Sequence, residues 1–222
     1  MQIRGLEVPG ALELTPAQHA DERGLFLEWY RSDELEAAVG RAMPLAQANC
    51  SVSRRGVVRG VHFADVPPSQ AKYVTCFAGA VLDVVVDLRV GSPAYGRWAA
   101  VRLDDVTRRA VYLPEGVGHA FCALSDSATV AYLCSEPYRP DREHAVHPLD
   151  PALGLPWPAD LELVLSPKDA AAPSLAEALA SGLLPSYESC LALGVARAGS
   201  AGRGGSEGRA GTGGQARASE GT

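Results

Sequence analysis

The sequence predicts a mainly β protein, a sandwich or barrel of short strands with a few short helices at its periphery. Three observations support this fold class. Short apolar runs with a period of two follow one another through residues 71–134, Gly, Pro and Asp separate them, and helical periodicity is confined to two short segments. A chain of 222 residues with 47% hydrophobic residues can build one sizeable core, so we expect one domain.

The first expected helix follows an N-terminal segment, residues 1–31, of short apolar pieces and turn sequences. Residues 32–39, SDELEAAV, fit a short helix with Ser32 as a candidate N-cap, because a serine hydroxyl accepts hydrogen bonds from the free amides of a first turn. Gly40 is the expected stop.

The strongest strand signal lies in AVLDVVVDLR, residues 80–89. A period of two places Leu82, Val84, Val86 and Leu88 on one face and Val81, Asp83, Val85 and Asp87 on the other. We expect residues 71–79, AKYVTCFAG, to be its hairpin partner, and Asp87 to be a structural, hydrogen-bonded carboxylate. Four further strands are expected in RWAAVRL, RAVYLP, HAFCAL and ATVAYLC.

The C-terminal part contains a second expected helix and then a tail. Ser174 and Glu177 have capping-box spacing, so residues 174–182, SLAEALASG, predict a helix outside the β core that Gly182 ends. Residues 196–222 consist of small and polar residues without a large apolar side chain, and such a segment cannot offset the entropy cost of ordering. The sequence therefore predicts a folded domain over residues 1–195 and a disordered tail over residues 196–222.

Charge and composition exclude several kinds of partner. A net charge of −6 disfavours a nucleic-acid partner, and no apolar run is long enough to cross a bilayer. The opening residues do not resemble a signal peptide, so we expect a cytoplasmic protein. The five cysteines lack C-x-x-C spacing, which favours reduced thiols over disulfides or a zinc site.

Two of the five histidines are candidates for chemistry, His62 and His119, since we expect His19, His144 and His147 to be solvated. His119 lies in LPEGVGHAF, which resembles the second conserved motif of cupin β-barrels and so favours a jelly-roll (cupin-like) barrel. Metal-binding cupins carry His-x-His and a glutamate in their first motif, whereas Phe63 and Ala64 follow His62 here. We therefore expect no metal.

Without a metal, the polar residues of a barrel interior suit proton transfer. A neutral imidazole is a natural general base near neutral pH, and a carboxylate on its second nitrogen fixes the tautomer. A tyrosine can return a proton from the other side, and a lysine can stabilise the oxygen of an enolate. This set of groups suits proton abstraction beside a ketone, and reprotonation on the opposite face gives an epimer.

Several separated motifs resemble, in order, the dTDP-4-dehydrorhamnose 3,5-epimerase family, over roughly residues 20–186. They are QANCSVSRRGVVRGVHF, QAKYVTCFAGAVLDVVVDLRVGSPAYGRW, YLPEGVGHAF, YLCSEPYRPDRE, LDPALGLPWP and LSPKD. The resemblance implies a jelly-roll fold, a homodimer, no metal or other cofactor, and a dTDP-4-keto-6-deoxyhexose substrate in deoxysugar or antibiotic biosynthesis.

The resemblance also assigns catalytic roles. His62 in RGVHF becomes the base that removes the proton next to the C4 ketone, with Asp169 of LSPKD as its carboxylate partner. Tyr132 in AYLC becomes the acid on the other face. Lys72 in QAKY stabilises the enolate oxygen, and Asp83 is a supporting carboxylate.

Further positions match substrate contacts of the family. Tyr138 matches an aromatic residue that stacks on thymine, and Arg23 and Arg59 match contacts to the nucleotide phosphates. The remaining substrate-binding positions are Phe26, Glu28, Gln47, Asn49, His119, Glu143 and Lys168.

Arg59 and His62 present a local conflict. Three residues separate them, so a regular strand would direct them to opposite faces, and both reach one cavity only if the strand is irregular. Gly60 is the expected site of a bulge.

The sequence leaves the inverted carbon open. Relatives in antibiotic pathways share these residues yet invert only C3 or only C5, and DVPPSQAKYVTCFAGAVLDVVVD and GVGHAF favour such a mono-epimerase. A metal-free dTDP-sugar 3,4-ketoisomerase, a metal-dependent cupin oxygenase and a noncatalytic nucleotide-sugar binding protein remain as alternatives.

Overall fold

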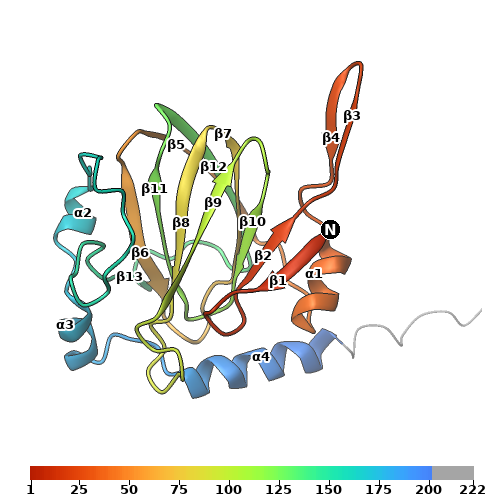
Figure 1. The fold of residues 1–222 in the computed structure, drawn as a ribbon. Helices are drawn as coiled ribbons and strands as arrows, with labels where there is room; N and C mark the ends of the chain where they lie inside the picture. The colour runs from red at the N-terminus through yellow and green to blue at the C-terminus, as the bar shows by residue number, and fades with distance from the viewer. Residues whose placement is uncertain (202–222) are drawn as a thin grey trace, which may run out of the picture.

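The computed structural model describes residues 1–201 and centres on two antiparallel sheets that face each other (Figure 1). The six-stranded sheet has the order β1 (Gln2–Gly5), β2 (Leu12–Thr15), β10 (Ala110–Leu113), β7 (Lys72–Ala78), β12 (Ser127–Cys134), β5 (Gln47–Arg54). The five-stranded sheet has the order β13 (Glu143–Ala145), β6 (Val58–Ala64), β11 (Gly118–Ala123), β8 (Ala80–Val86), β9 (Trp98–Asp104). The predicted mainly β jelly roll is confirmed, as an open sandwich in which no described sheet closes on itself.

The pairing expected for residues 71–79 and 80–89 is wrong. Both segments are strands, but β7 pairs with β10 and β12, whereas β8 pairs with β9 and β11 in the other sheet. Gly79 joins them with a φ of 75°, and a Cβ there would lie 2.2 Å from the Ser127 carbonyl oxygen. This turn passes the chain from one sheet to the other instead of folding it into a hairpin.

The alternation in β8 is confirmed, and both of its faces are buried. Val81 and Val85 lie in the cluster between the sheets, while Val84 and Val86 lie in a second cluster on the outer face. Leu175 of α3 (Leu175–Ala180) packs in this second cluster. A strand covered on both sides needs apolar residues at nearly every position, which explains the density of valine in this segment.

The short helices agree with the prediction except at one cap. α1 spans Ser32–Val39 and ends at Gly40, whose φ is 80°, but Arg31 occupies the N-cap position without a side-chain cap, and Ser32 is already inside the helix. The second predicted helix is α3, and its capping box between Ser174 and Glu177 is present.

Two helices were not predicted, α2 (Pro167–Ala170) and α4 (Tyr187–Ala201). α4 crosses one end of the sandwich (Figure 1) and continues past residue 195, where composition predicts the folded domain to end. The rest of the predicted tail, residues 202–222, lies outside the described residues. None of the helices within residues 1–201 is long and apolar enough to cross a membrane.

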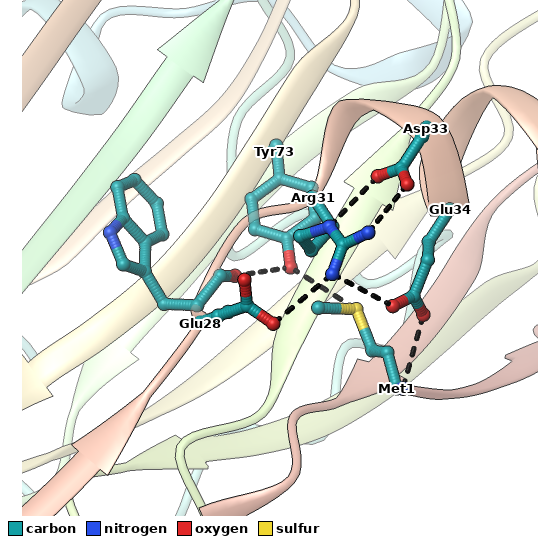
Figure 2. A network of polar contacts seen from close by, with 7 residues as sticks. Met1, Glu28, Arg31, Asp33, Glu34 and Tyr73 are labelled. Carbon is teal, nitrogen blue, oxygen red and sulfur yellow. Dashed lines mark hydrogen bonds and ion pairs between the residues drawn. The ribbon is translucent and has the colours of Figure 1, made fainter.

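β3 (Gln18–Asp21) and β4 (Gly24–Leu27) form a hairpin that projects from the body of the protein (Figure 1). An ion-pair network lies at the foot of this hairpin, where the Arg31 guanidinium contacts Glu28, Asp33 and Glu34 (Figure 2). Glu34 also binds the amino group of Met1. The network fixes the chain between the hairpin and α1.

The cysteines are free thiols, as predicted. Cys50 is exposed on β5, and the other four are buried. Asp87 is fully buried and accepts hydrogen bonds from Arg89 and Ser92, which confirms its structural role.

Candidate active site

A β-bulge in β6 brings Arg59 and His62 to the same face, as the sequence predicts. His62 lies opposite His119 of β11 and Arg59 lies opposite Phe121, so two residues of β6 between these pairs face one residue of β11. Gly60 occupies the extra position with a φ of 124°, and a Cβ there would lie 2.4 Å from the His119 carbonyl oxygen. Only glycine fits this close approach of the two strands.

Side chains from both sheets meet in a small inner cavity of about 150 Å³ between them. Its lining residues are Ser51, Arg59, His62, Lys72, His119, Phe121 and Tyr132. Strands β5, β7 and β12 of the six-stranded sheet supply three of them, and β6 and β11 of the other sheet supply the rest. A molecule in this cavity is therefore approached from two opposite sides.

A larger outer cavity of about 440 Å³ adjoins the inner one, with Arg59, His62 and Tyr132 lining both. It extends along the edge of β6 and β13 toward α2. Other residues of its lining are Tyr138, Glu143, His144, Ser166, Lys168 and Asp169. The two volumes together form one elongated site with a narrow inner end.

His62 is held by Asp169 at the junction of the two cavities. The distance from His62 Nε2 to Asp169 Oδ1 is 2.7 Å, and the Asp169 side chain is 4% exposed. Burial acts to raise the Asp169 pKa, but hydrogen bonds from His62, Ser166 and the Gly60 backbone outweigh it and hold that pKa below its ordinary value. The ionised carboxylate accepts from Nε2–H, which leaves the lone pair of the imidazole on Nδ1.

A second histidine–carboxylate pair lies beside the first. His119 Nε2 lies 2.7 Å from Asp83 Oδ2, and the Asp83 side chain is fully buried behind it. The pair stands on neighbouring strands, since Asp83 of β8 is opposite Phe121 of β11. The predicted support by Asp83 is therefore a contact to His119.

Tyr132 and Lys72 face the histidines from the six-stranded sheet. Burial is the main cause that raises the pKa of Tyr132, so its phenol remains protonated at neutral pH. Lys72 lies opposite Cys134, at the end of β7 that reaches the inner cavity. Arg59 and Lys72 give this cavity positive charge suited to an anionic oxygen.

The inner face of β5 carries a row of polar residues that supports the site. Ser53 Oγ accepts a hydrogen bond of 3.0 Å from Arg59 Nε. Gln47 donates to Asn49 at 2.7 Å and accepts from the Tyr138 backbone amide at 2.8 Å. Gln47 and Asn49 line neither cavity, but Gln47 holds the backbone of Tyr138, which lines the outer one.

Three predicted substrate-binding residues lie on or beside the projecting hairpin, away from the two cavities. Arg23 and Phe26 belong to the projecting hairpin, with side chains 90% and 66% exposed, and Arg23 pairs with Asp21. Glu28 lies at the foot of the hairpin and binds Arg31 (Figure 2). None of the three lines a described cavity next to His62.

The structure also corrects the interpretation of His144 and adds residues to the site. His144 is not a solvated histidine, because its Nε2 lies 2.6 Å from Asp65 Oδ1 and its side chain lines the outer cavity. Ser51 and Ser53 were not predicted, although QANCSVS alternates polar residues on one face, a pattern that could have identified them. His19 is exposed, as expected.

The arrangement suits proton transfer at a carbon between two sheets. His62 offers a basic nitrogen, Tyr132 offers a protonated phenol from the opposing sheet, and Lys72 offers a cation for a developing negative charge. Within residues 1–201, no group of three or more His, Cys, Asp and Glu side chains is arranged to hold a metal ion.

Comparison with known sequences identifies epimerases of dTDP-linked sugars as relatives of this chain. The family model for dTDP-4-dehydrorhamnose 3,5-epimerase matches residues 5–177. A dTDP-4-dehydrorhamnose 3-epimerase of Streptomyces niveus is 62% identical over 195 residues, 88% of this chain and 94% of the relative. A dTDP-4-dehydrorhamnose 3,5-epimerase of Mycolicibacterium smegmatis is 58% identical over 192 residues, 86% of this chain and 94% of the relative.

Solved structures give the same likeness in three dimensions. A 4-keto-6-deoxy sugar epimerase from the novobiocin gene cluster of Streptomyces spheroides has a TM-score of 0.84 and 62% identity, covering 86% of this chain and 95% of that one. A 3′-monoepimerase of Streptomyces bikiniensis, in complex with dTDP-quinovose, has a TM-score of 0.85 and 49% identity. The match covers 87% of this chain and 98% of that one.

Proposed function

The chain belongs to the dTDP-4-dehydrorhamnose 3,5-epimerase family, and from this premise we propose how its residues epimerise a dTDP-4-keto-6-deoxyhexose. The reaction inverts C3, C5 or both, the two carbons beside the C4 ketone, in deoxysugar biosynthesis. The observation that carries the proposal is that His62 and Tyr132 line the same inner cavity from opposing sheets.

His62 is the base. Its Nδ1 takes the proton from the carbon beside the ketone, the C–H electron pair forms a carbon–carbon double bond, and the ketone oxygen becomes an enolate oxygen. Asp169 stabilises the imidazolium that results, since its carboxylate lies 2.7 Å from Nε2 and stays ionised.

Tyr132 is the acid. Its phenolic proton is delivered to the same carbon from the opposite side, the ketone forms again, and the configuration is inverted. The phenolate then takes a proton from solvent and His62 releases one to solvent, so that both side chains return to their starting protonation states. A tyrosine whose pKa is raised by burial keeps the proton that this step requires.

Lys72 stabilises the enolate oxygen between the two proton transfers, and His119 lies beside it at a substrate-binding position. Both line the inner cavity, and the Asp83 carboxylate fixes the orientation of His119 from behind. A fixed cation near a developing oxyanion lowers the barrier without moving.

The nucleotide occupies the outer cavity. Arg59, held by Ser53, binds the diphosphate where the two cavities meet. Lys168 and Glu143 line the outer cavity, which holds the rest of the nucleotide. Tyr138 is 53% exposed at the rim, so that its ring is free to stack on the thymine base.

The projecting hairpin serves the site of a second copy in a homodimer. Arg23, Phe26 and Glu28 cannot contact a ligand in the cavity beside His62 of their own chain, because the hairpin points away from the body (Figure 1). The exposed Phe26 is unfavourable in water, and a partner subunit would cover it. Each active site of the dimer then combines residues of two chains.

One experiment tests the activity. The protein is incubated with dTDP-4-keto-6-deoxy-D-glucose in deuterated water, and NMR reads deuterium and configuration at C3 and C5. We expect deuterium with inversion at C3, at C5 or at both carbons, and the labelled carbon identifies which centre the enzyme inverts. No deuterium, with a control epimerase active in the same sample, contradicts the proposal, and movement of the carbonyl to C3 indicates a ketoisomerase.

Complementation tests the shared site. An Arg23→Ala chain, which should bind the nucleotide weakly, and a His62→Ala chain, which lacks the base, are unfolded and refolded together as a 1:1 mixture and assayed at a substrate concentration far below KM. Half of the dimers are then mixed and each has one intact site, so we expect about a quarter of wild-type activity. Activity no higher than that of either parent argues against the hairpin's role in the second subunit.

A further inference from the structure

Ser51 is a buried hydroxyl in the inner cavity that the mechanism above does not use. It lies on the inner face of β5, opposite Val130 of β12. Its Oγ is shielded from solvent and has no hydrogen-bond partner among the described residues. An unsatisfied buried hydroxyl destabilises a protein, so its presence in a ligand cavity indicates that a ligand satisfies it.

The proposed mechanism already engages the other polar groups of the cavity. Lys72 and Arg59 only donate hydrogen bonds, and both are needed for negative charge. The Nε2 atoms of His62 and His119 are occupied by Asp169 and Asp83. A serine hydroxyl both donates and accepts, and it carries no charge, which matches the hydroxyl of a sugar ring.

The position of Ser51 along β5 indicates which part of the sugar it meets. Two residues onward on the same face, Ser53 holds Arg59, the proposed ligand of the diphosphate on C1. On the neighbouring strand, Tyr132 lies two residues from Val130, the partner of Ser51. Ser51 therefore lies between Arg59, the proposed ligand of the diphosphate on C1, and the acid Tyr132, and C2 is the hydroxyl-bearing carbon next to C1.

We propose that Ser51 is a specificity-determining residue that hydrogen-bonds the C2 hydroxyl of the substrate and so distinguishes 6-deoxy from 2,6-dideoxy sugars. The proposal rests on the proposed function, because it requires the sugar to occupy the inner cavity. A site built around a substrate hydroxyl leaves a buried group unpaired when that hydroxyl is missing.

The test compares two substrates, dTDP-4-keto-6-deoxyglucose and its 2-deoxy counterpart, with wild type, Ser51→Ala and Ser51→Thr. We expect Ser51→Ala to lower kcat/KM for the first about tenfold and to change it for the 2-deoxy sugar by less than about twofold. Ser51→Thr restores the hydroxyl and should keep most of the wild-type preference. Affinity for dTDP alone should stay unchanged in both variants, because dTDP has no hexose.

Ser127→Ala is the matched control, since Ser127 is an exposed serine at the far end of β12. Equal losses for both substrates, or no loss in Ser51→Ala, overturn the proposal. If Ser51→Ala does not fold, Ser51→Cys, which has a weaker hydrogen-bonding group of similar size, provides the comparison. A wild-type protein that turns over neither sugar instead refutes the proposed function.

Discussion

Arg59 and His62 point into one cavity although an odd number of steps along β6 separates them. The extra residue at Gly60 restores the common face, and it also places His62 directly opposite His119 of β11. The site therefore depends on a backbone irregularity as much as on its side chains, and a bulge beside a functional residue is a recurrent way to redirect it.

Gly60→Ala should lower the free energy of unfolding by about 2–4 kcal/mol, because the new Cβ meets the His119 carbonyl oxygen and the Ala120 Cβ at 2.4 and 2.5 Å. Turnover should fall as well, since relief of this clash moves His62. Urea unfolding at a fixed protein concentration measures the first effect. Gly5→Ala is the control, with open space around its Cβ, and equal destabilisation in both variants would count against this account.

Asp169→Asn should lower kcat by roughly 10²- to 10⁴-fold with little change in the affinity for dTDP. The amide carries no charge to stabilise the His62 imidazolium, and it can impose the wrong tautomer. Steady-state kinetics and calorimetric titration with dTDP separate the two quantities. A variant with near wild-type kcat would show that the contact at 2.7 Å is only structural.

Tyr132→Phe should lower kcat by roughly a hundredfold or more, by the same factor from pH 6 to pH 9. Burial raises the pKa of Tyr132 above its ordinary value of 10, so its phenol does not titrate in this range. The ratio of wild-type to variant kcat, measured across these pH values, isolates Tyr132 from other groups. A ratio that declines steadily from pH 7 upward would mean that Tyr132 loses its proton there.

The ionised Asp104 carboxylate should stabilise the folded state, and this stabilisation should be lost at acidic pH. Burial opposes its ionisation, but hydrogen bonds from Thr107, Arg102 and Val106 lower its pKa to about 2, from 3.8. A lowered pKa stabilises the folded state above pH 4, and this contribution disappears as the pH falls toward 2.

Asp104→Asn should therefore lower the free energy of unfolding by up to about 2 kcal/mol at pH 7 and by progressively less below pH 4. Urea unfolding of both proteins at pH 7, 4 and 2.5 tests this. A difference that stays constant over the series would contradict the assignment to charge.

Much of the fold was predictable because it follows from local patterns. The alternation in β8, the capping box at Ser174 and the glycine after α1 each express a local rule. Pairing was not predictable in the same way, since Gly79 can close a hairpin or pass the chain between sheets, and contacts distant in sequence decide between them.

In the site, too, features that follow from local sequence were predictable, and features that depend on contacts distant in sequence were not. The odd spacing of Arg59 and His62, together with the family resemblance that assigns both to one site, predicted a bulge at Gly60. His144 was misinterpreted because its charged, proline-rich surroundings resemble a solvated loop, while its partner Asp65 is distant in the sequence. The alternating polar residues of β5 were visible, but only the facing sheet shows that Ser51 and Ser53 border a cavity.

The central claim is that one base and one acid act on opposite faces of the same carbon. It is tested by following the substrate in deuterated water with Tyr132→Phe and with His62→Asn. In Tyr132→Phe, His62 should still remove the proton and return deuterium to the same face, so NMR should find deuterium without inversion. In His62→Asn, neither should occur. Inversion at the wild-type rate in Tyr132→Phe, or deuterium uptake at the wild-type rate in His62→Asn, would contradict the account.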